Sequence, residues 1–164
     1  IIYIAFNAAI PYIRPLDYNT TQMQCTRIIR FDAAHRIVGH SGKCRRLHGH
    51  RYVLEATFDS NFLDELNMVV DFSVIKEKLQ GWIDINWDHN TILSLEDKTL
   101  GNAIEDSTGQ KIYYLHHNPT AEGMAYYILH KVCPLLFDEI KITCVSIKLY
   151  ETPNCYVLEK LSKY

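Results

Sequence analysis

The chain has 164 residues, of which 48% are hydrophobic and 22% are charged, a composition typical of a globular protein with its own core. Its formal net charge of −2 favours neither a nucleic-acid partner nor binding to an anionic membrane surface. The five cysteines include no Cys-x-x-Cys pair, so we expect free thiols and a cytoplasmic, reducing location.

The first 24 residues carry the least information. Residues 1–13 are apolar, but they are too short to span a bilayer and lack the basic residues that open a signal peptide. Residues 14–24 are polar and read as a connector. We therefore predict an N-terminal arm, extra strand or connector over residues 1–24, and a single domain over residues 25–164.

Three histidines are predicted to meet on two neighbouring strands. A strand over residues 25–35 places His35 on its apolar face, and a strand that begins at His48 places His48 and His50 on one face, because side chains alternate along a strand. If the two strands pair antiparallel, the imidazoles gather at one end of the sheet. Three nitrogen ligands with one open position are typical of a catalytic Zn²⁺ site. Ordinary core or surface histidines are the alternative.

Cys44 lies four residues before His48, between Lys43, Arg45 and Arg46. Positive charge favours the ionised thiolate, so this pattern indicates a reactive cysteine. A buried, inert thiol is the alternative, since free cysteines are often buried, but the flanking charges argue against burial here.

A first helix is predicted over residues 72–85, capped by Asp71, because apolar residues then recur at helical spacing. Asp88 and His89 follow it. A carboxylate beside an imidazole can make an acid–base pair that works near neutral pH. Neighbours in sequence need not touch, so a purely structural role remains the alternative. Residues 94–117 are polar and turn-rich, and they read as a loop or projecting hairpin.

A second helix is predicted after Thr120, which can cap it, and two final strands are predicted over residues 141–151 and 155–159. Glu151 ends an apolar row and needs a partner, because an unpaired buried charge is costly. That partner is an arginine, a backbone amide, or a heterocycle that presents a ring N–H beside an exocyclic amine. The order predicts an α+β fold: a four-stranded antiparallel sheet in ββααββ order, with two helices on one face.

Six ordered motifs between residues 25 and 160 resemble the 6-pyruvoyltetrahydropterin synthase family, which includes the 6-carboxytetrahydropterin synthases of queuosine biosynthesis. They are Phe-Asp-Ala-Ala-His-Arg (31–36), Cys-Arg-Arg-Leu-His-Gly-His (44–50), Val-Asp-Phe (70–72), Asp-His-Asn (88–90), Asn-Pro-Thr-Ala-Glu (118–122) and Tyr-Glu-Thr (150–152). Residues 1–24 and 94–115 fall outside the matched motifs.

The resemblance implies a role for each predicted site residue. The zinc ligands would be His35, His48 and His50; the general base would be Cys44, with Asp88 and His89 completing the proton-transfer set; Glu151 would anchor the pterin, with Thr120 nearby. It also implies the tunnelling fold and a homohexamer built as a dimer of trimers, with active sites at subunit interfaces.

The implied substrate is the small molecule 7,8-dihydroneopterin triphosphate. The compact Cys-x-x-x-His-Gly-His spacing resembles the carboxy branch, so we expect 6-carboxy-5,6,7,8-tetrahydropterin, acetaldehyde and triphosphate as products. The first alternative is the pyruvoyl branch, which eliminates triphosphate and keeps the side chain. The second is a zinc- or pterin-binding module without turnover. A third branch of the family carries glutamate near the cysteine position, and Cys44 argues against it.

Overall fold

The computed structural model describes residues 23–162, and its first strand begins at Gln24. The predicted N-terminal arm or connector therefore lies outside the described residues, except for its last two positions. Among the described helices, none has both the length and the apolar character needed to cross a membrane.

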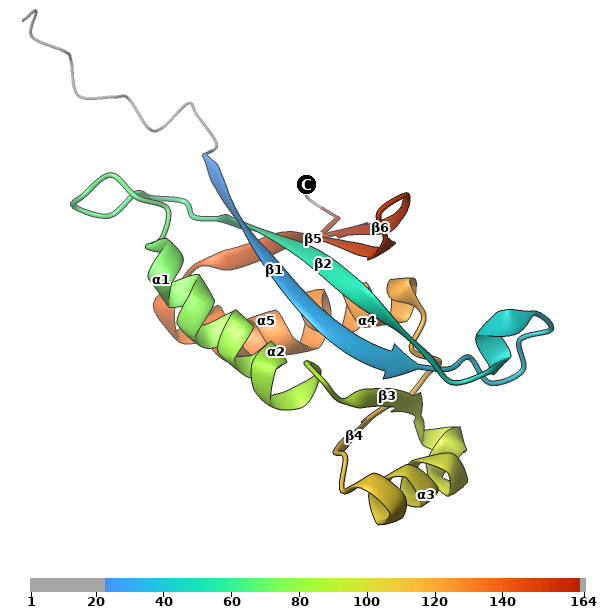
Figure 1. Ribbon diagram of the computed structural model, residues 1–164. Helices are drawn as coiled ribbons and strands as arrows, with labels where there is room; N and C mark the ends of the chain where they lie inside the picture. The colour runs from blue at the N-terminus through green and yellow to red at the C-terminus, as the bar shows by residue number, and fades with distance from the viewer. Residues whose placement is uncertain (1–22, 163–164) are drawn as a thin grey trace, which may run out of the picture.

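Six strands form one mixed sheet in the order β4-β3-β1-β2-β5-β6 (Figure 1). They are β1 (Gln24–His35), β2 (His48–Asp59), β3 (Thr91–Ser94), β4 (Ile112–Leu115), β5 (Thr143–Thr152) and β6 (Cys155–Lys160). The four strands β1, β2, β5 and β6 pair antiparallel, whereas β3 runs parallel to both β1 and β4. The α+β class is confirmed, but the expectation of only four antiparallel strands in ββααββ order is corrected to this six-stranded mixed sheet.

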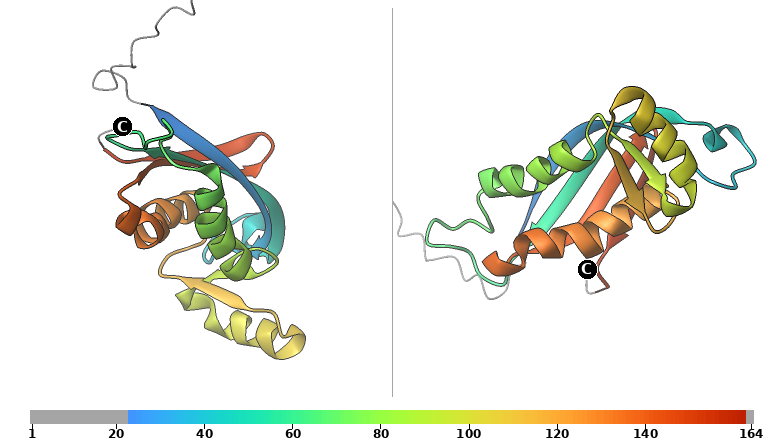
Figure 2. Two further views of the ribbon diagram at one scale, coloured as in Figure 1. Left: turned by 90° about the vertical axis from the view of Figure 1, so that its left-hand side faces the viewer. Right: turned by 90° about the horizontal axis from the view of Figure 1, so that it is seen from below.

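Two long helical segments cover one face of the sheet (Figure 2). The first runs through α1 (Phe72–Ile75), a π-helical turn (Lys76–Gln80) and α2 (Gly81–Asn86). The second runs through α4 (Ala121–Tyr127), a π-helical turn (Ile128–Val132) and α5 (Cys133–Phe137), followed by a 3₁₀ turn (Asp138–Ile140). Both begin at predicted caps: Ser73 N–H donates to Asp71 Oδ1 over 2.7 Å, and Gly123 N–H donates to Thr120 Oγ1 over 3.1 Å.

The polar segment after the first helices is not the predicted loop or hairpin. It forms β3, a 3₁₀ turn (Leu95–Asp97), helix α3 (Lys98–Thr108) and β4, so that α3 makes the crossover between two parallel strands. Helix α3 packs closely on β4, because a Cβ at the buried Gly101 would overlap the hydroxyl of Tyr114. It ends at Gly109, whose φ of 70° is a left-handed conformation that favours glycine.

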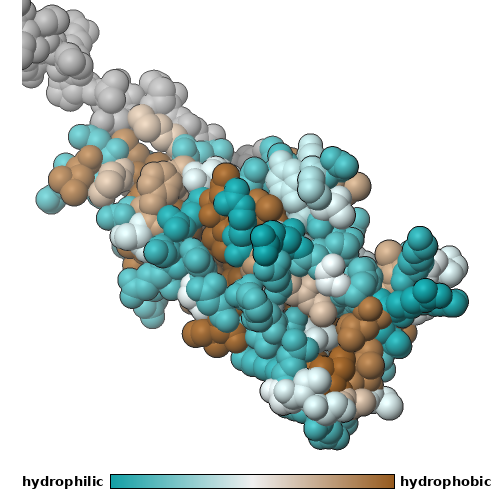
Figure 3. Space-filling view, viewed as in Figure 1, coloured by the Kyte–Doolittle hydropathy of each residue, from teal (hydrophilic) through white to brown (hydrophobic). Residues whose placement is uncertain are grey.

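The core lies between the sheet and the two helical segments. Its largest fully buried side chains come from both layers: Ile29, Tyr52, Leu54, Phe58, Ile75, Leu79, Ile83, Trp87, Ile92, Leu115 and Phe137. Burial of one such side chain is worth about 1.5–3 kcal/mol. This packing fixes β1 and β2, and with them the end of the sheet where the predicted histidines lie. Over the face seen in Figure 3, hydrophobic residues form separate patches among polar ones.

Candidate active site

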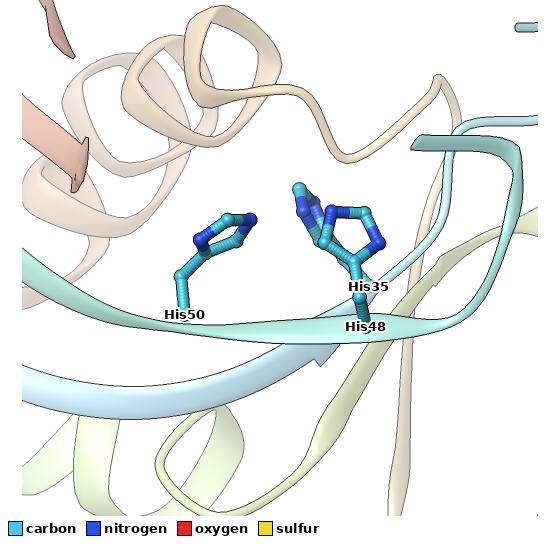
Figure 4. Close-up of side chains that lie close together, drawn as sticks. All are labelled: His35, His48 and His50. Atoms are coloured by element: carbon cyan, nitrogen blue, oxygen red, sulfur yellow. The ribbon is translucent and has the colours of Figure 1, made fainter. Parts of the chain in front are cut away.

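The three predicted histidines meet at the end of β1 and the start of β2. His35 pairs directly with His48, and His50 pairs with Ala33, so the antiparallel register puts all three imidazoles on the helix-covered side of the strands (Figure 4). Their ring centroids lie 4.6–5.2 Å apart. One nitrogen from each ring lies within 4.8 Å of the others, which is the arrangement of a three-ligand metal site.

Hydrogen bonds to backbone carbonyls orient two of the rings. His35 Nδ1–H donates to Pro119 O over 2.7 Å, and His48 Nδ1–H donates to Arg46 O over 2.7 Å. Each bond leaves Nε2 as the unprotonated nitrogen that can hold a cation. Within the described residues the buried Nε2 of His35 has no hydrogen-bond partner, and the buried Nε2 of His50 makes no hydrogen bond but faces the carboxylate of Glu151 at 3.3 Å. Because buried polar atoms are normally satisfied, the unpartnered Nε2 of His35 fits a bound metal ion.

The environment of His35 and His50 favours neutral imidazoles, the form that binds metal. Burial lowers the pKa of His35 and of His50, because desolvation penalises the charged ring, and the carboxylate of Glu151 opposes this shift at both. Among residues 23–162 the cluster holds three imidazole nitrogens and no fourth ligand, a donor set that suits Zn²⁺ with an open position.

A cavity of about 290 Å³ adjoins the cluster and brings three further predicted residues to it. Cys44, Thr120 and Glu151 line this cavity together with His35. Its other walls come from Ile37, His40, Ala121, Glu122, Cys155, Tyr156 and Val157. The sequence segments before β2, before α4 and at the β5–β6 turn therefore converge on one concave site.

Glu151 lies where the pairing register of β5 with β6 shifts between Tyr150 and Thr152. The irregularity adds one residue to β5, and such bulges commonly re-aim a side chain. Glu151 Oε1 lies 3.3 Å from His50 Nε2, and the glutamate side chain is 27% exposed. The carboxylate thus contacts the histidine cluster and also borders the cavity, where two acceptor oxygens could receive two parallel donors.

Cys44 sits in a 3₁₀ turn (Lys43–Arg45) within the segment that joins β1 to β2. Its carbonyl accepts a hydrogen bond from Ile37 N–H over 2.9 Å, which closes the segment into a loop. The thiol is partly exposed at the cavity wall, as a reactive cysteine requires.

Asp88 and His89 touch each other but lie away from this cavity, along the edge of β1. Asp88 Oδ1 accepts from Asp32 N–H over 2.8 Å, and Asp88 Oδ2 accepts from His89 Nδ1–H over 2.8 Å. The hydrogen bond to Asp88 raises the pKa of His89. The His89 side chain is 79% exposed and lines an open hollow with Asp32 and Arg51, which His50 also borders but Cys44 does not. One chain therefore does not bring this pair to Cys44.

Several contacts that position the site had no assigned role in the sequence. Pro119 orients His35, and the side chain of Asn118 pairs with the backbone of Val38. Arg36, the residue after His35, forms an ion pair with the buried Asp97 from the 3₁₀ turn before α3. Asn118 and Pro119 belong to the Asn-Pro-Thr-Ala-Glu motif, so the sequence could have indicated them. Asp97, the partner of Arg36, lies in a segment that no motif covered.

Comparison with known proteins identifies the class to which this fold and site belong. The family model of 6-pyruvoyl tetrahydropterin synthase matches residues 24–160. The chain belongs to this family.

Two curated relatives are named 6-carboxy-5,6,7,8-tetrahydropterin synthase. The protein from Rickettsia bellii is 54% identical over 82% of this chain and 98% of its own length. The protein from Bacillus subtilis is 33% identical over 92% of this chain and 94% of its own. Among solved structures, 6-pyruvoyl tetrahydropterin synthase from Caenorhabditis elegans has a TM-score of 0.62 at 22% identity, covering 87% of this chain and 97% of that chain, and it supports the fold.

Proposed function

We propose that the protein is a zinc-dependent lyase that converts 7,8-dihydroneopterin triphosphate to 6-carboxy-5,6,7,8-tetrahydropterin, with release of acetaldehyde and triphosphate. The observation that carries this proposal is the convergence of three histidines, Cys44 and Glu151 on one cavity. Relatives named for the carboxy product, at 54% and 33% identity, favour this branch over the pyruvoyl one. The product belongs to the precursor pathway of queuosine, and we place the reaction in the cytoplasm.

His35, His48 and His50 would hold the zinc ion through the nitrogens that face one another. When bound, Zn²⁺ supplies Lewis acidity, which polarises substrate oxygens and makes adjacent protons easier to remove. The bonds from His35 and His48 to backbone carbonyls orient these two rings.

Glu151 would anchor the pterin ring. A 2-aminopyrimidinone offers a ring N–H and an exocyclic amine as parallel donors, and an ionised carboxylate accepts both. Thr120 borders the same cavity, and its hydroxyl oxygen is already engaged by Gly123 N–H. We assign Thr120 to shaping the pterin end of the cavity while it caps α4.

Cys44 would act as the general base that takes a carbon-bound proton from the substrate side chain. His89, oriented by Asp88, would move protons on the other side of that side chain, and its raised pKa suits a group that carries a proton near neutral pH.

Cys44 and His89 line different hollows of one chain, so we propose that a second copy supplies Asp88 and His89 to the cavity of the first. Sites at subunit interfaces follow from this arrangement. The assembly that we propose is a homohexamer, formed as a dimer of trimers.

Product analysis tests the reaction. The zinc-loaded protein should consume dihydroneopterin triphosphate and yield the carboxy product, acetaldehyde and triphosphate, identified by mass spectrometry. The Cys44→Ala variant should retain zinc and lose roughly 10²–10⁴-fold in turnover, the usual contribution of a positioned base. A pyruvoyl product without aldehyde would assign the protein to the other branch. Binding of the pterin without turnover would instead identify a non-catalytic module.

A further inference from the structure

We propose that Asn118 is a positioning residue that sets the place of the Cys44 loop relative to the histidine cluster. The inference rests on the function proposed above for Cys44, and it adds a residue to which no role has been assigned. Asn118 is partly buried in the connection between β4 and α4, 80 residues from its contact at Val38.

The Asn118 side chain makes two hydrogen bonds to one residue. Val38 N–H donates to Asn118 Oδ1 over 2.9 Å, and Asn118 Nδ2–H donates to Val38 O over 2.9 Å. The amide plane, with one acceptor and one donor, thus matches both backbone groups of Val38 as a neighbouring strand would. Neither aspartate nor alanine can make both bonds.

Val38 lies at the base of the loop that carries the thiol. The preceding residue, Ile37, donates its N–H to Cys44 O over 2.9 Å. A restraint on Val38 is therefore passed to Cys44 through one peptide unit and one hydrogen bond. The loop between them includes Gly39 and Gly42 and has no strand or long helix to hold it.

The other side of the same connection holds the metal ligands. Pro119, the next residue, accepts the Nδ1–H of His35 over 2.7 Å, and Thr120 then caps α4 through Gly123 N–H. Asn118 and Pro119 thus directly precede the N-cap of α4, and each contacts a different part of the site. Asn118 contacts the Cys44 loop at Val38, whereas Pro119 contacts His35 of the histidine cluster. Together they set the spacing between the Cys44 thiol and the histidine cluster. A misplacement of about 1 Å in such a spacing can lower the rate roughly 10²-fold.

The test compares Asn118→Asp and Asn118→Ala with Asn102→Ala, which changes an exposed asparagine of α3. Asparagine and aspartate have nearly the same shape, so a role in packing alone would tolerate the first change. Asn118→Asp places an acceptor against Val38 O and should therefore slow kcat roughly 10²-fold, with KM within about threefold of wild type. The Asn102→Ala control should leave both constants unchanged.

Two further readouts do not depend on turnover. The rate at which iodoacetamide alkylates Cys44 is measured on the metal-free protein by peptide mass spectrometry. This rate should change at least about fivefold in both Asn118 variants, whereas Asn102→Ala should alkylate at the wild-type rate. In the wild-type protein, the Val38 amide should exchange as slowly as amides of β1, since it is bonded to a partly buried side chain.

Wild-type kcat and wild-type Cys44 alkylation in a folded Asn118→Asp variant would overturn the proposal. Fast exchange at Val38 would overturn it even if both variants failed to fold. If the wild-type protein shows no turnover, the proposed function fails, while the alkylation and exchange results still decide the role of Asn118.

Discussion

The histidines on β1 and β2 and the histidine that lies along the edge of β1 have opposite environments. On the helix-covered face, burial lowers the pKa of His35 and His50, and their free nitrogens point toward one another. At the edge of the other hollow, His89 is exposed, and its bond to Asp88 raises its pKa. Desolvation thus dominates on one side, and a carboxylate partner dominates on the other.

This difference separates two chemical tasks that one residue type can perform. A neutral imidazole is a metal ligand, and an imidazole that keeps its proton near neutral pH is an acid–base group. The sequence contains both kinds of histidine within 55 residues, between His35 and His89, and only their surroundings distinguish them.

The largest expected effect comes from removing two ligands on the buried face. The purified protein should carry about one zinc per chain, and the His48→Ala, His50→Ala double variant should lose most of it together with its turnover, since a single remaining imidazole binds zinc weakly. Metal analysis after dialysis measures this loss. His116→Ala, which removes an exposed histidine, serves as the control and should keep its zinc. Full zinc occupancy in the double variant would contradict the ligand assignment.

A smaller effect is expected from Glu151→Gln. The amide keeps the shape but offers only one acceptor and no charge, so we expect a loss of about 1.5–3 kcal/mol in substrate binding, or roughly 10- to 150-fold in KM. Zinc content should remain that of wild type. Steady-state kinetics measures the change, with Glu139→Gln as the control at an exposed carboxylate that does not line the cavity. An unchanged KM in a folded variant would mean that Glu151 only partners His50.

The smallest effect concerns pH. In NMR titrations of the metal-free protein, the pKa of His89 should lie above its ordinary value of 6.5 and that of His35 below it. The Asp88→Asn variant should lower the pKa of His89 toward the ordinary value and leave His35 unchanged. Because its folded-state pKa is raised, His89 contributes stability that is present below the unfolded-state pKa and is lost as pH rises through the folded-state pKa. The lowered pKa of His35 has the opposite sign, so its burial costs stability as pH falls below about 6.5. Equal pKa values for His89 and His35 would contradict the difference in environment inferred for the two residues.

The sequence was sufficient where a strong local pattern and the tertiary packing agreed. Alternation in β1 and β2 predicted the face of His35, His48 and His50, and the caps at Asp71 and Thr120 predicted where both helical segments begin. These patterns also predicted the antiparallel core of the sheet. They succeeded because one apolar face had to be buried in each element.

The remaining features depend on long-range contacts that no local pattern records. Strands β3 and β4 have four residues each, too few to show a period, and α3 is polar over most of its length. Their parallel pairing is stabilised by packing such as Gly101 against Tyr114. Likewise, the bond of Asn118 to Val38 joins residues that are 80 positions apart. Only the folded chain shows such partners.

Complementation between two inactive variants tests most directly whether the two histidine environments form one active site. Cys44→Ala removes the proposed base, and His89→Ala removes the proposed proton carrier, so each homogeneous protein should lack turnover. Co-expressed with different affinity tags and purified through both, the mixed assembly should convert dihydroneopterin triphosphate, because some cavities then combine an intact Cys44 with an intact His89 from a second copy. A mixed assembly that forms but remains as inactive as its parents would contradict the shared site.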